Sequence, residues 1–149
     1  MSLSLLAAQI DALLENETNL IANLSNASAL LNDSLADINW VGFYLYDPQT
    51  DQLDLGPFQG KVACMHIQNG VGVCGTALKE NKVLRVANVH EFAGHIACDS
   101  ASNSEIVFPL VKDGEILGVL DIDSPKLDRF SAEDEQKLSA FVEALLKHL

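Results

Sequence analysis

The most informative stretch of the chain reads Ile106-Val107-Phe108-Pro109-Leu110-Val111-Lys112-Asp113-Gly114-Glu115-Ile116-Leu117-Gly118-Val119-Leu120-Asp121-Ile122-Asp123. Two apolar runs flank an Asp-Gly pair, a pattern that predicts a β-hairpin. A two-residue turn would place Asp121 on the apolar face. We therefore expect a three-residue loop, with Val111 opposite Glu115 and Glu105 opposite Asp121, because a one-residue slip moves every side chain to the other face.

In that register the two faces of the hairpin differ sharply. One face is wholly apolar and carries Ile106, Phe108, Leu110, Ile116, Leu120 and Ile122. The other face ends in three carboxylates, Glu105, Asp121 and Asp123. Directly opposed residues have Cβ atoms about 5 Å apart, so Glu105 and Asp121 cannot both ionise without strong repulsion. We expect one of them to hold a proton near neutral pH and the pair to titrate together.

Further elements extend outward from the hairpin. Helical spacing of apolar residues predicts helices over 3–14 and 20–35, and a capping box at Ser131 and Asp134 begins a closing helix. Strands are predicted at 38–46, 52–55, 62–67 and 83–86, with a short helix at 72–80. These elements predict a single α+β domain over 1–149. Its N-terminal helices lie in 1–36, and the central antiparallel sheet, the site loops and the C-terminal helix lie in 38–149. We expect the N- and C-terminal helices to lie on one face of the sheet.

Composition narrows the class of protein. The chain has 149 residues, 48% of them hydrophobic, and a formal net charge of −12. Nucleic acids and anionic membranes attract clustered Lys and Arg, so neither is an expected partner. The first residues lack the basic region of a signal peptide, and no apolar run approaches the length of a membrane span. We expect a soluble, cytoplasmic protein whose cysteines stay reduced.

One cysteine stands in a polar loop directly before the hairpin. The loop runs Gly94-His95-Ile96-Ala97-Cys98-Asp99-Ser100-Ala101-Ser102-Asn103-Ser104-Glu105. A thiol in such a loop is accessible and becomes a nucleophile if its pKa is lowered. Cys98 would lie beside the carboxylate cluster, which could supply a general acid and bind a substrate ammonium group. His95 receives no role, because a lone histidine in a loop is usually just exposed.

Four blocks of sequence carry a resemblance to a known family. They are Gly56-Pro57-Phe58-Gln59-Gly60-Lys61-Val62-Ala63-Cys64, Gly72-Val73-Cys74-Gly75-Thr76-Ala77, the loop 94–106 around Cys98, and Gly118-Val119-Leu120-Asp121-Ile122-Asp123-Ser124. Together they resemble the free methionine-(R)-sulfoxide reductases, which are stand-alone enzymes of the GAF fold. The resemblance extends from about Trp40 to the C-terminal helix and implies a single GAF domain.

The resemblance also implies roles for the three cysteines. Cys98 matches the attacking cysteine, Cys64 the resolving one, and Cys74 an auxiliary thiol. The implied cycle forms a sulfenic acid on Cys98, then a Cys64–Cys98 disulfide, or alternatively a Cys74–Cys98 disulfide, and thioredoxin regenerates the thiols. The chemistry requires no metal and no organic cofactor.

The remaining implied residues form the substrate pocket. Glu105, Asp121 and Asp123 match carboxylates that bind the substrate and protonate the sulfoxide, and Trp40 and Tyr44 match aromatic walls around the S-methyl group. From pattern alone, the carboxylates could also be a solvated sheet end and the aromatic residues part of the core. The apolar stripes of the terminal helices allow a homodimer without requiring one.

Two other functions are considered. Zinc could be bound by Cys64, Cys74 and Cys98 with His66 or His95, but no Cys-x-x-Cys pair is present and the ligands are widely spread. A GAF domain could instead bind a small regulator such as a cyclic nucleotide or a tetrapyrrole. Such modules normally adjoin an output domain, for which 149 residues leave no room.

Overall fold

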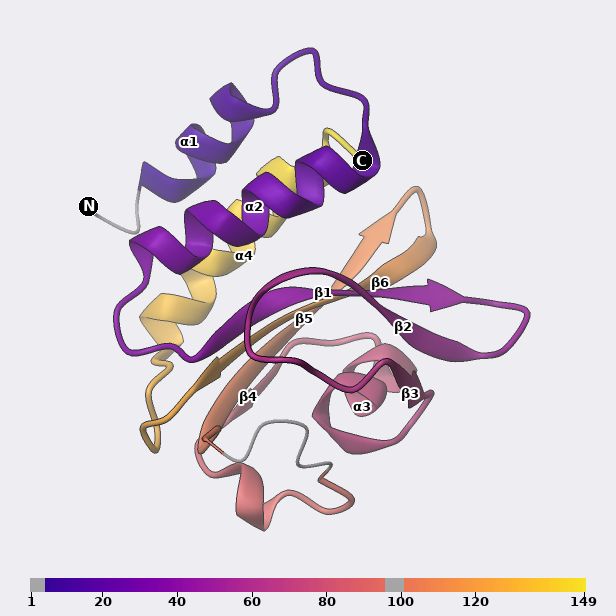
Figure 1. Ribbon diagram of the computed structural model, residues 1–149, viewed down its shortest axis with the longest axis vertical. Helices are drawn as coiled ribbons and strands as arrows, with labels where there is room; N and C mark the ends of the chain where they lie inside the picture. Colours follow the sequence, from indigo (N-terminus) through magenta and orange to yellow (C-terminus); the bar gives the residue numbers. More distant parts are fainter. Residues whose placement is uncertain (1–4, 96–100) are drawn as a thin grey trace.

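A six-stranded antiparallel sheet is the centre of the computed structural model, which describes residues 5–95 and 101–149. Its strand order is β3-β2-β1-β6-β5-β4, so the hairpin β5–β6 and the strand β1 form the middle (Figure 1). The strands are β1 (Trp40–Asp47), β2 (Gln52–Gly60), β3 (His66–Gln68), β4 (Leu84–Val86), β5 (Ser104–Lys112) and β6 (Glu115–Ser124). The expected antiparallel α+β fold is confirmed.

The α-helices of the described residues are α1 (Leu6–Leu13), α2 (Leu20–Ser34), α3 (Gly72–Glu80) and α4 (Ala132–Leu146). On one face of the sheet α2 and α4 pack against the strands and α1 packs on α4, whereas α3 lies on the other face (Figure 1). The predicted capping box begins α4, because Ser131 and Asp134 each accept a hydrogen bond from the other's backbone N–H. Within the described residues, no helix has both the length and the apolar character needed to cross a membrane.

Each face of the sheet has its own apolar core. The core between the sheet and helices α1, α2 and α4 contains Phe43, Phe108 and Leu120 from the strands and Phe141 from α4, all essentially inaccessible to solvent. Each such side chain contributes about 1.5–3 kcal/mol of burial free energy. The other core packs α3 against Leu53 and Val119, among others, and it includes Trp40 and Tyr44. Alternation along β1 therefore sends Phe43 to the helix-covered core and Trp40 and Tyr44 to the α3 side.

The loop of the β5–β6 hairpin differs from the predicted one. Lys112 pairs with Glu115, so the connection is a two-residue turn in which Asp113 and Gly114 both have positive φ, 54° and 79°. The expected three-residue loop was wrong because a β-bulge follows: Leu110 pairs with Gly118 and Val111 with Ile116. The extra residue restores the apolar alternation that a plain two-residue turn would have broken.

The observed register differs from the predicted one by two residues, one from the shorter turn and one from the bulge, and most face assignments stay intact. Glu105 pairs with Asp123, and Val107 with Asp121, so the predicted Glu105–Asp121 pair was wrong. The apolar face is confirmed except at Ile116, which packs on the α3 side. Gly118 stands at the bulge with φ 154°, where a Cβ atom would lie 2.1 Å from the carbonyl oxygen of Tyr44. Only glycine allows β6 to approach β1 this closely.

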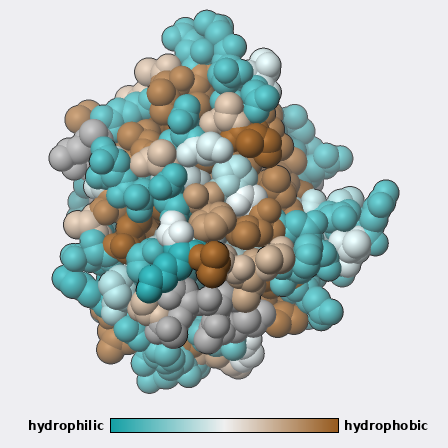
Figure 2. Space-filling model, viewed as in Figure 1, coloured by the Kyte–Doolittle hydropathy of each residue, from teal (hydrophilic) through white to brown (hydrophobic). Residues whose placement is uncertain are grey.

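Other elements are shifted at their ends. The strand expected over 62–67 shortens to β3, so Cys64 lies in the connection after β2 rather than in a strand. Ile38 precedes β1 and packs in the helix-covered core, not on the face of Trp40. The turn between β1 and β2 projects from the body of the molecule and is covered by polar side chains (Figures 1 and 2).

Candidate active site

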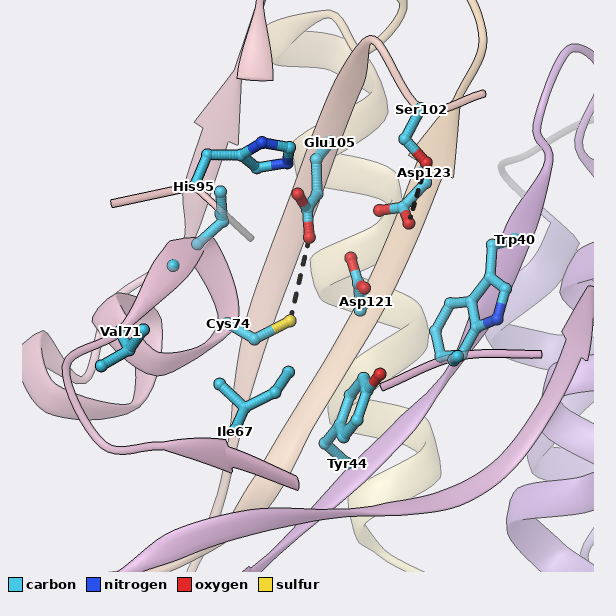
Figure 3. A pocket seen from close by; sticks show the side chains of 13 residues that line it. Trp40, Tyr44, Ile67, Val71, Cys74, His95, Ser102, Glu105, Asp121 and Asp123 are labelled. Atoms are coloured by element: carbon cyan, nitrogen blue, oxygen red, sulfur yellow. Dashed lines mark hydrogen bonds between the residues drawn. The ribbon is translucent and has the colours of Figure 1, made fainter. Parts of the chain in front are cut away.

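A pocket lies on the α3 side of the sheet, above the middle strands (Figure 3). Strands β1, β5 and β6 form its floor, α3 contributes one wall, and loops complete it. The described residues that line it are Trp40, Tyr44, Ala63, Ile67, Val71, Gly72, Val73, Cys74, His95, Ser102, Glu105, Asp121 and Asp123. The pocket thus brings together six of the eight site residues that the sequence predicted.

The sheet register places the three carboxylates. Glu105 on β5 is directly opposite Asp123 on β6, and Asp123 is in turn opposite Trp40 on β1. Asp121, two residues before Asp123, points to the same face and lies opposite Gly42. Gly42 lies between Trp40 and Tyr44 on β1, and β2 approaches it closely because it has no side chain. A Cβ atom on Gly42 would lie 2.2 Å from the Cβ of Phe58.

Burial raises the pKa of two of the three carboxyl groups. Glu105, Asp121 and Asp123 are 7%, 5% and 9% exposed. Burial, and then the charges of Asp123 and Glu105, raise the pKa of Asp121 well above its ordinary value. Burial and the charge of Glu105 likewise raise the pKa of Asp123. The raised pKa values make Asp121 and Asp123 candidates for a general acid that donates a proton to a ligand oxygen.

Two of the carboxylate oxygens lack a hydrogen-bond donor among the described residues. Ser102 Oγ donates to Asp123 Oδ2 at 3.3 Å, whereas Asp121 Oδ1 and Asp123 Oδ1 are buried and accept no hydrogen bond from the described residues. None of the described lining residues is Lys or Arg. Buried polar atoms are normally paired, so these oxygens indicate a ligand that carries N–H groups or positive charge.

Two aromatic rings form the wall opposite α3. Trp40 stacks on Tyr44 with ring centroids 5.8 Å apart and on Phe58 at 5.2 Å. Trp40 Nε1 donates to the carbonyl oxygen of Lys61, and the Tyr44 hydroxyl donates to that of Cys64 at 3.0 Å. Their polar atoms are thus bonded to the loop before β3. This wall suits an apolar, polarizable group such as methylthio.

The cysteines occupy different environments. Cys74 is a free thiol in α3 with its Sγ atom 3.8 Å from Glu105 Oε2 (Figure 3). Burial, together with the neighbouring carboxylates, raises the pKa of Cys74 well above its ordinary value. Cys64 is partly buried in the loop that accepts the Tyr44 hydrogen bond, and it is disulfide-bonded, whereas Cys74 is free. Cys98 lies outside the described residues, so its role and its disulfide partner stay predictions.

Two polar pocket residues, and a glycine beside the pocket, received no role from the sequence. His95 lines the pocket near Glu105 (Figure 3), although it had been given no role. Ser102 holds Asp123 and itself accepts a hydrogen bond from Asn39 Nδ2 at 3.0 Å. Gly42 lets β2 approach β1 closely next to Trp40. For His95 and Ser102 the available signal was their place in the polar loop around Cys98. For Gly42 it was a glycine inside a strand.

Of the zinc ligands considered from the sequence, His66 lies away from the pocket. His66 Nδ1 pairs with Asp54 Oδ1 at 2.7 Å on an exposed surface, and His66 does not line the pocket. Within the described residues, the side chains close enough to share one ion are Cys74, Glu105 and Asp121.

Comparison with known proteins agrees with this site. A family model for the GAF domain matches residues 9–148. The free methionine-R-sulfoxide reductase of Escherichia coli is 58% identical over 139 residues, which cover 93% of this chain and 83% of the relative. The enzyme of the same name from Saccharomyces cerevisiae is 46% identical over 143 residues, covering 92% and 77%.

Solved structures give the same result. The fRMsr of Staphylococcus aureus in complex with substrate has a TM-score of 0.93 at 54% identity, covering 99% of this chain and 95% of that one. The free methionine-R-sulfoxide reductase of Neisseria meningitidis, in complex with its substrate, has a TM-score of 0.92 at 43% identity, covering 96% and 85%. The chain therefore belongs to the GAF-domain family and, within it, to the free methionine-(R)-sulfoxide reductases.

Proposed function

We propose that this chain reduces free L-methionine-(R)-sulfoxide to L-methionine, with Cys98 as the nucleophile. The observation that carries the proposal is the buried carboxylate cluster of Glu105, Asp121 and Asp123 facing the rings of Trp40 and Tyr44. Such a pocket matches a molecule with an ammonium group, a basic oxygen and an apolar methyl group. Relatives that carry this activity in their names, two of them with substrate bound, support the assignment.

Substrate binding follows from the charges of the pocket. The ammonium group of a free amino acid would donate to the carboxylate oxygens that have no donor among the described residues, Asp121 Oδ1 and Asp123 Oδ1. The S-methyl group would lie against Trp40 and Tyr44. A methionine within a peptide lacks the ammonium group and would leave buried oxygens unpaired, which is costly. Selectivity for the free amino acid therefore depends on these acids.

The chemical step needs an acid as well as a nucleophile. The Cys98 thiolate attacks the sulfoxide sulfur while a protonated carboxyl group, for which Asp121 is the favoured candidate, donates its proton to the oxygen. The S–O bond breaks, methionine leaves, and Cys98 takes the oxygen as a sulfenic acid. Sulfur of the substrate gains two electrons and Cys98 loses them.

A second thiol then completes the cycle. Cys64 attacks the sulfenic acid, forms a disulfide with Cys98 and releases water, with Cys74 as the alternative partner. An external dithiol such as thioredoxin reduces the disulfide by thiol exchange. The overall reaction converts one sulfoxide and one dithiol into methionine, a disulfide and water. We propose that this cycle runs in the cytoplasm, where dithiol reductants are maintained. We also propose that it needs no metal or organic cofactor and that it proceeds in a monomer or a homodimer.

The test is a substrate panel with purified, reduced protein. Methionine formation is followed with dithiothreitol, and then with thioredoxin, on free R sulfoxide, free S sulfoxide and N-acetylmethionine sulfoxide. We expect turnover of the free R form and a loss of at least about 100-fold in kcat/KM on N-acetylation, since the acids lose their charged partner. Tight binding of the R form without consumption would instead identify a sensor. Equal rates on the free and N-acetylated forms would exclude the proposed role of the acids.

A further inference from the structure

Cys74, Glu105 and Asp121 form a compact set of metal-ligand side chains in the pocket. All three are buried, and one ligand atom from each lies within 4.8 Å of the others. Cys74 Sγ and Glu105 Oε2 are 3.8 Å apart. A tetrahedral zinc ion holds sulfur at about 2.3 Å and a carboxylate oxygen at about 2.0 Å, which separates two such ligands by roughly 3.5 Å. The thiol and the carboxylate are thus already spaced for one ion.

The surroundings of this set favour a cation. Asp121 Oδ1 is buried and accepts no hydrogen bond from the described residues, and neither does Asp123 Oδ1 on the same face of β6. No described residue that lines the pocket is Lys or Arg. Figure 3 shows the carboxylates and the thiol converging on one space. Asp123 stands on the same face of the sheet but outside the group of side chains close enough to share one ion, and its Oδ2 accepts a hydrogen bond from Ser102.

The donor set selects the kind of ion. Mg²⁺ and Ca²⁺ prefer oxygen ligands, whereas a thiolate with two carboxylates suits Zn²⁺. We propose that the substrate-free protein binds Zn²⁺ reversibly through Cys74, Glu105 and Asp121, and that the bound ion excludes methionine sulfoxide from the pocket. Binding replaces the thiol proton, which leaves to solvent, and no electron is transferred. Only the identity of the excluded molecule depends on the proposed function; the metal site does not.

The test uses Co²⁺ as a spectroscopic probe of thiolate coordination. In a Cys64→Ser/Cys98→Ser double variant, Cys74 is the remaining thiol of the chain. We expect one equivalent of Co²⁺ to produce a thiolate charge-transfer band that Zn²⁺ abolishes by displacement. Adding Cys74→Ser should remove the band, and adding Glu105→Gln or Asp121→Asn should weaken Co²⁺ binding at least about tenfold, since each removes an anionic ligand.

Two controls distinguish the loss of the metal site from the loss of the fold. Glu115→Gln, at an exposed position on β6, should leave Co²⁺ binding unchanged. Circular dichroism checks that each variant is folded. A folded double variant with no band, or a band that Glu105→Gln and Asp121→Asn both leave unchanged, would overturn the site.

Substrate competition tests the exclusion. Free methionine-(R)-sulfoxide should raise the apparent Kd for Co²⁺ in the double variant, which lacks the nucleophile and cannot consume it. If the wild-type protein turns the sulfoxide over yet the sulfoxide leaves Co²⁺ affinity unchanged, the exclusion is wrong. If the wild type shows no turnover, the proposed function fails while the Co²⁺ titration still decides the metal site.

Discussion

Glu105 and Asp123 lie directly opposite each other in the ladder between β5 and β6, and both side chains are buried. Like charges in this position destabilise a sheet, and the charge of Glu105 contributes to the raised pKa of Asp123. Desolvated, mutually repelling carboxyl groups of this kind are typical of functional sites. The end of the hairpin is therefore a candidate site for proton transfer and for binding a cation, rather than a solvated sheet end.

The first prediction concerns Asp121→Asn. The amide has nearly the same shape but cannot deliver a carboxyl proton, so we expect kcat for free methionine-(R)-sulfoxide to fall by about 100-fold or more. Steady-state kinetics with dithiothreitol measures this. The matched control is Asp113→Asn in the exposed hairpin turn, where φ is 54° and asparagine is well accommodated. Equal kcat for wild type and Asp121→Asn would remove Asp121 from the chemistry.

The same variant should alter the pH dependence of stability. Burial raises the folded-state pKa of Asp121 above the ordinary value of 3.8, so between those two pKa values the folded chain binds more protons than the unfolded chain. The free energy of unfolding contributed by this group is therefore greatest in acid and falls as pH rises. We expect the free energy of unfolding of the wild type, minus that of Asp121→Asn, to decrease between pH about 4 and about 7 when both are measured in urea titrations. A difference that rises with pH would contradict the assignment.

Gly42→Ala should disturb the floor of the pocket. The added Cβ would lie 2.2 Å from the Cβ of Phe58, so β1 and β2 must separate, at a cost of about 1–3 kcal/mol. Gly114→Ala is the control, because nothing lies within 4 Å of its Cβ position and only the positive φ of 79° is strained. We expect Gly42→Ala to lower both thermal stability and kcat/KM, and Gly114→Ala to lower stability alone. Full activity in Gly42→Ala would show that the close approach of β2 to β1 at this point is unimportant for the site.

The β5–β6 hairpin shows how much of the fold the sequence pattern predicts. Alternating apolar residues correctly assigned nearly every side chain of β5 and β6 to its face, because burial of one face outweighs local preferences. The register was missed because a β-bulge adds a residue beside Gly118, and alternation alone cannot tell a three-residue loop from a two-residue turn followed by a bulge. Glycine inside the strand was the available signal.

The residues of the candidate site were predicted in part. The carboxylates were found because they stood on one face of the predicted hairpin, and Trp40 and Tyr44 were found from the family resemblance. His95 and Ser102 were missed because loop residues enter a pocket through tertiary packing, which leaves no periodic pattern in the sequence. Cys64 was placed in a strand because β-branched neighbours suggested one, whereas the structure has a loop there.

The most direct measurement is a single turnover without reductant. Reduced protein is mixed with excess free methionine-(R)-sulfoxide, and the methionine formed per chain is determined by rapid quenching. We predict about one equivalent from the wild type and from Cys64→Ser, with Cys98 oxidised in the latter, and none from Cys98→Ser, since one attacking thiolate supplies two electrons. Methionine formed by Cys98→Ser in the same yield as by the wild type would contradict the account.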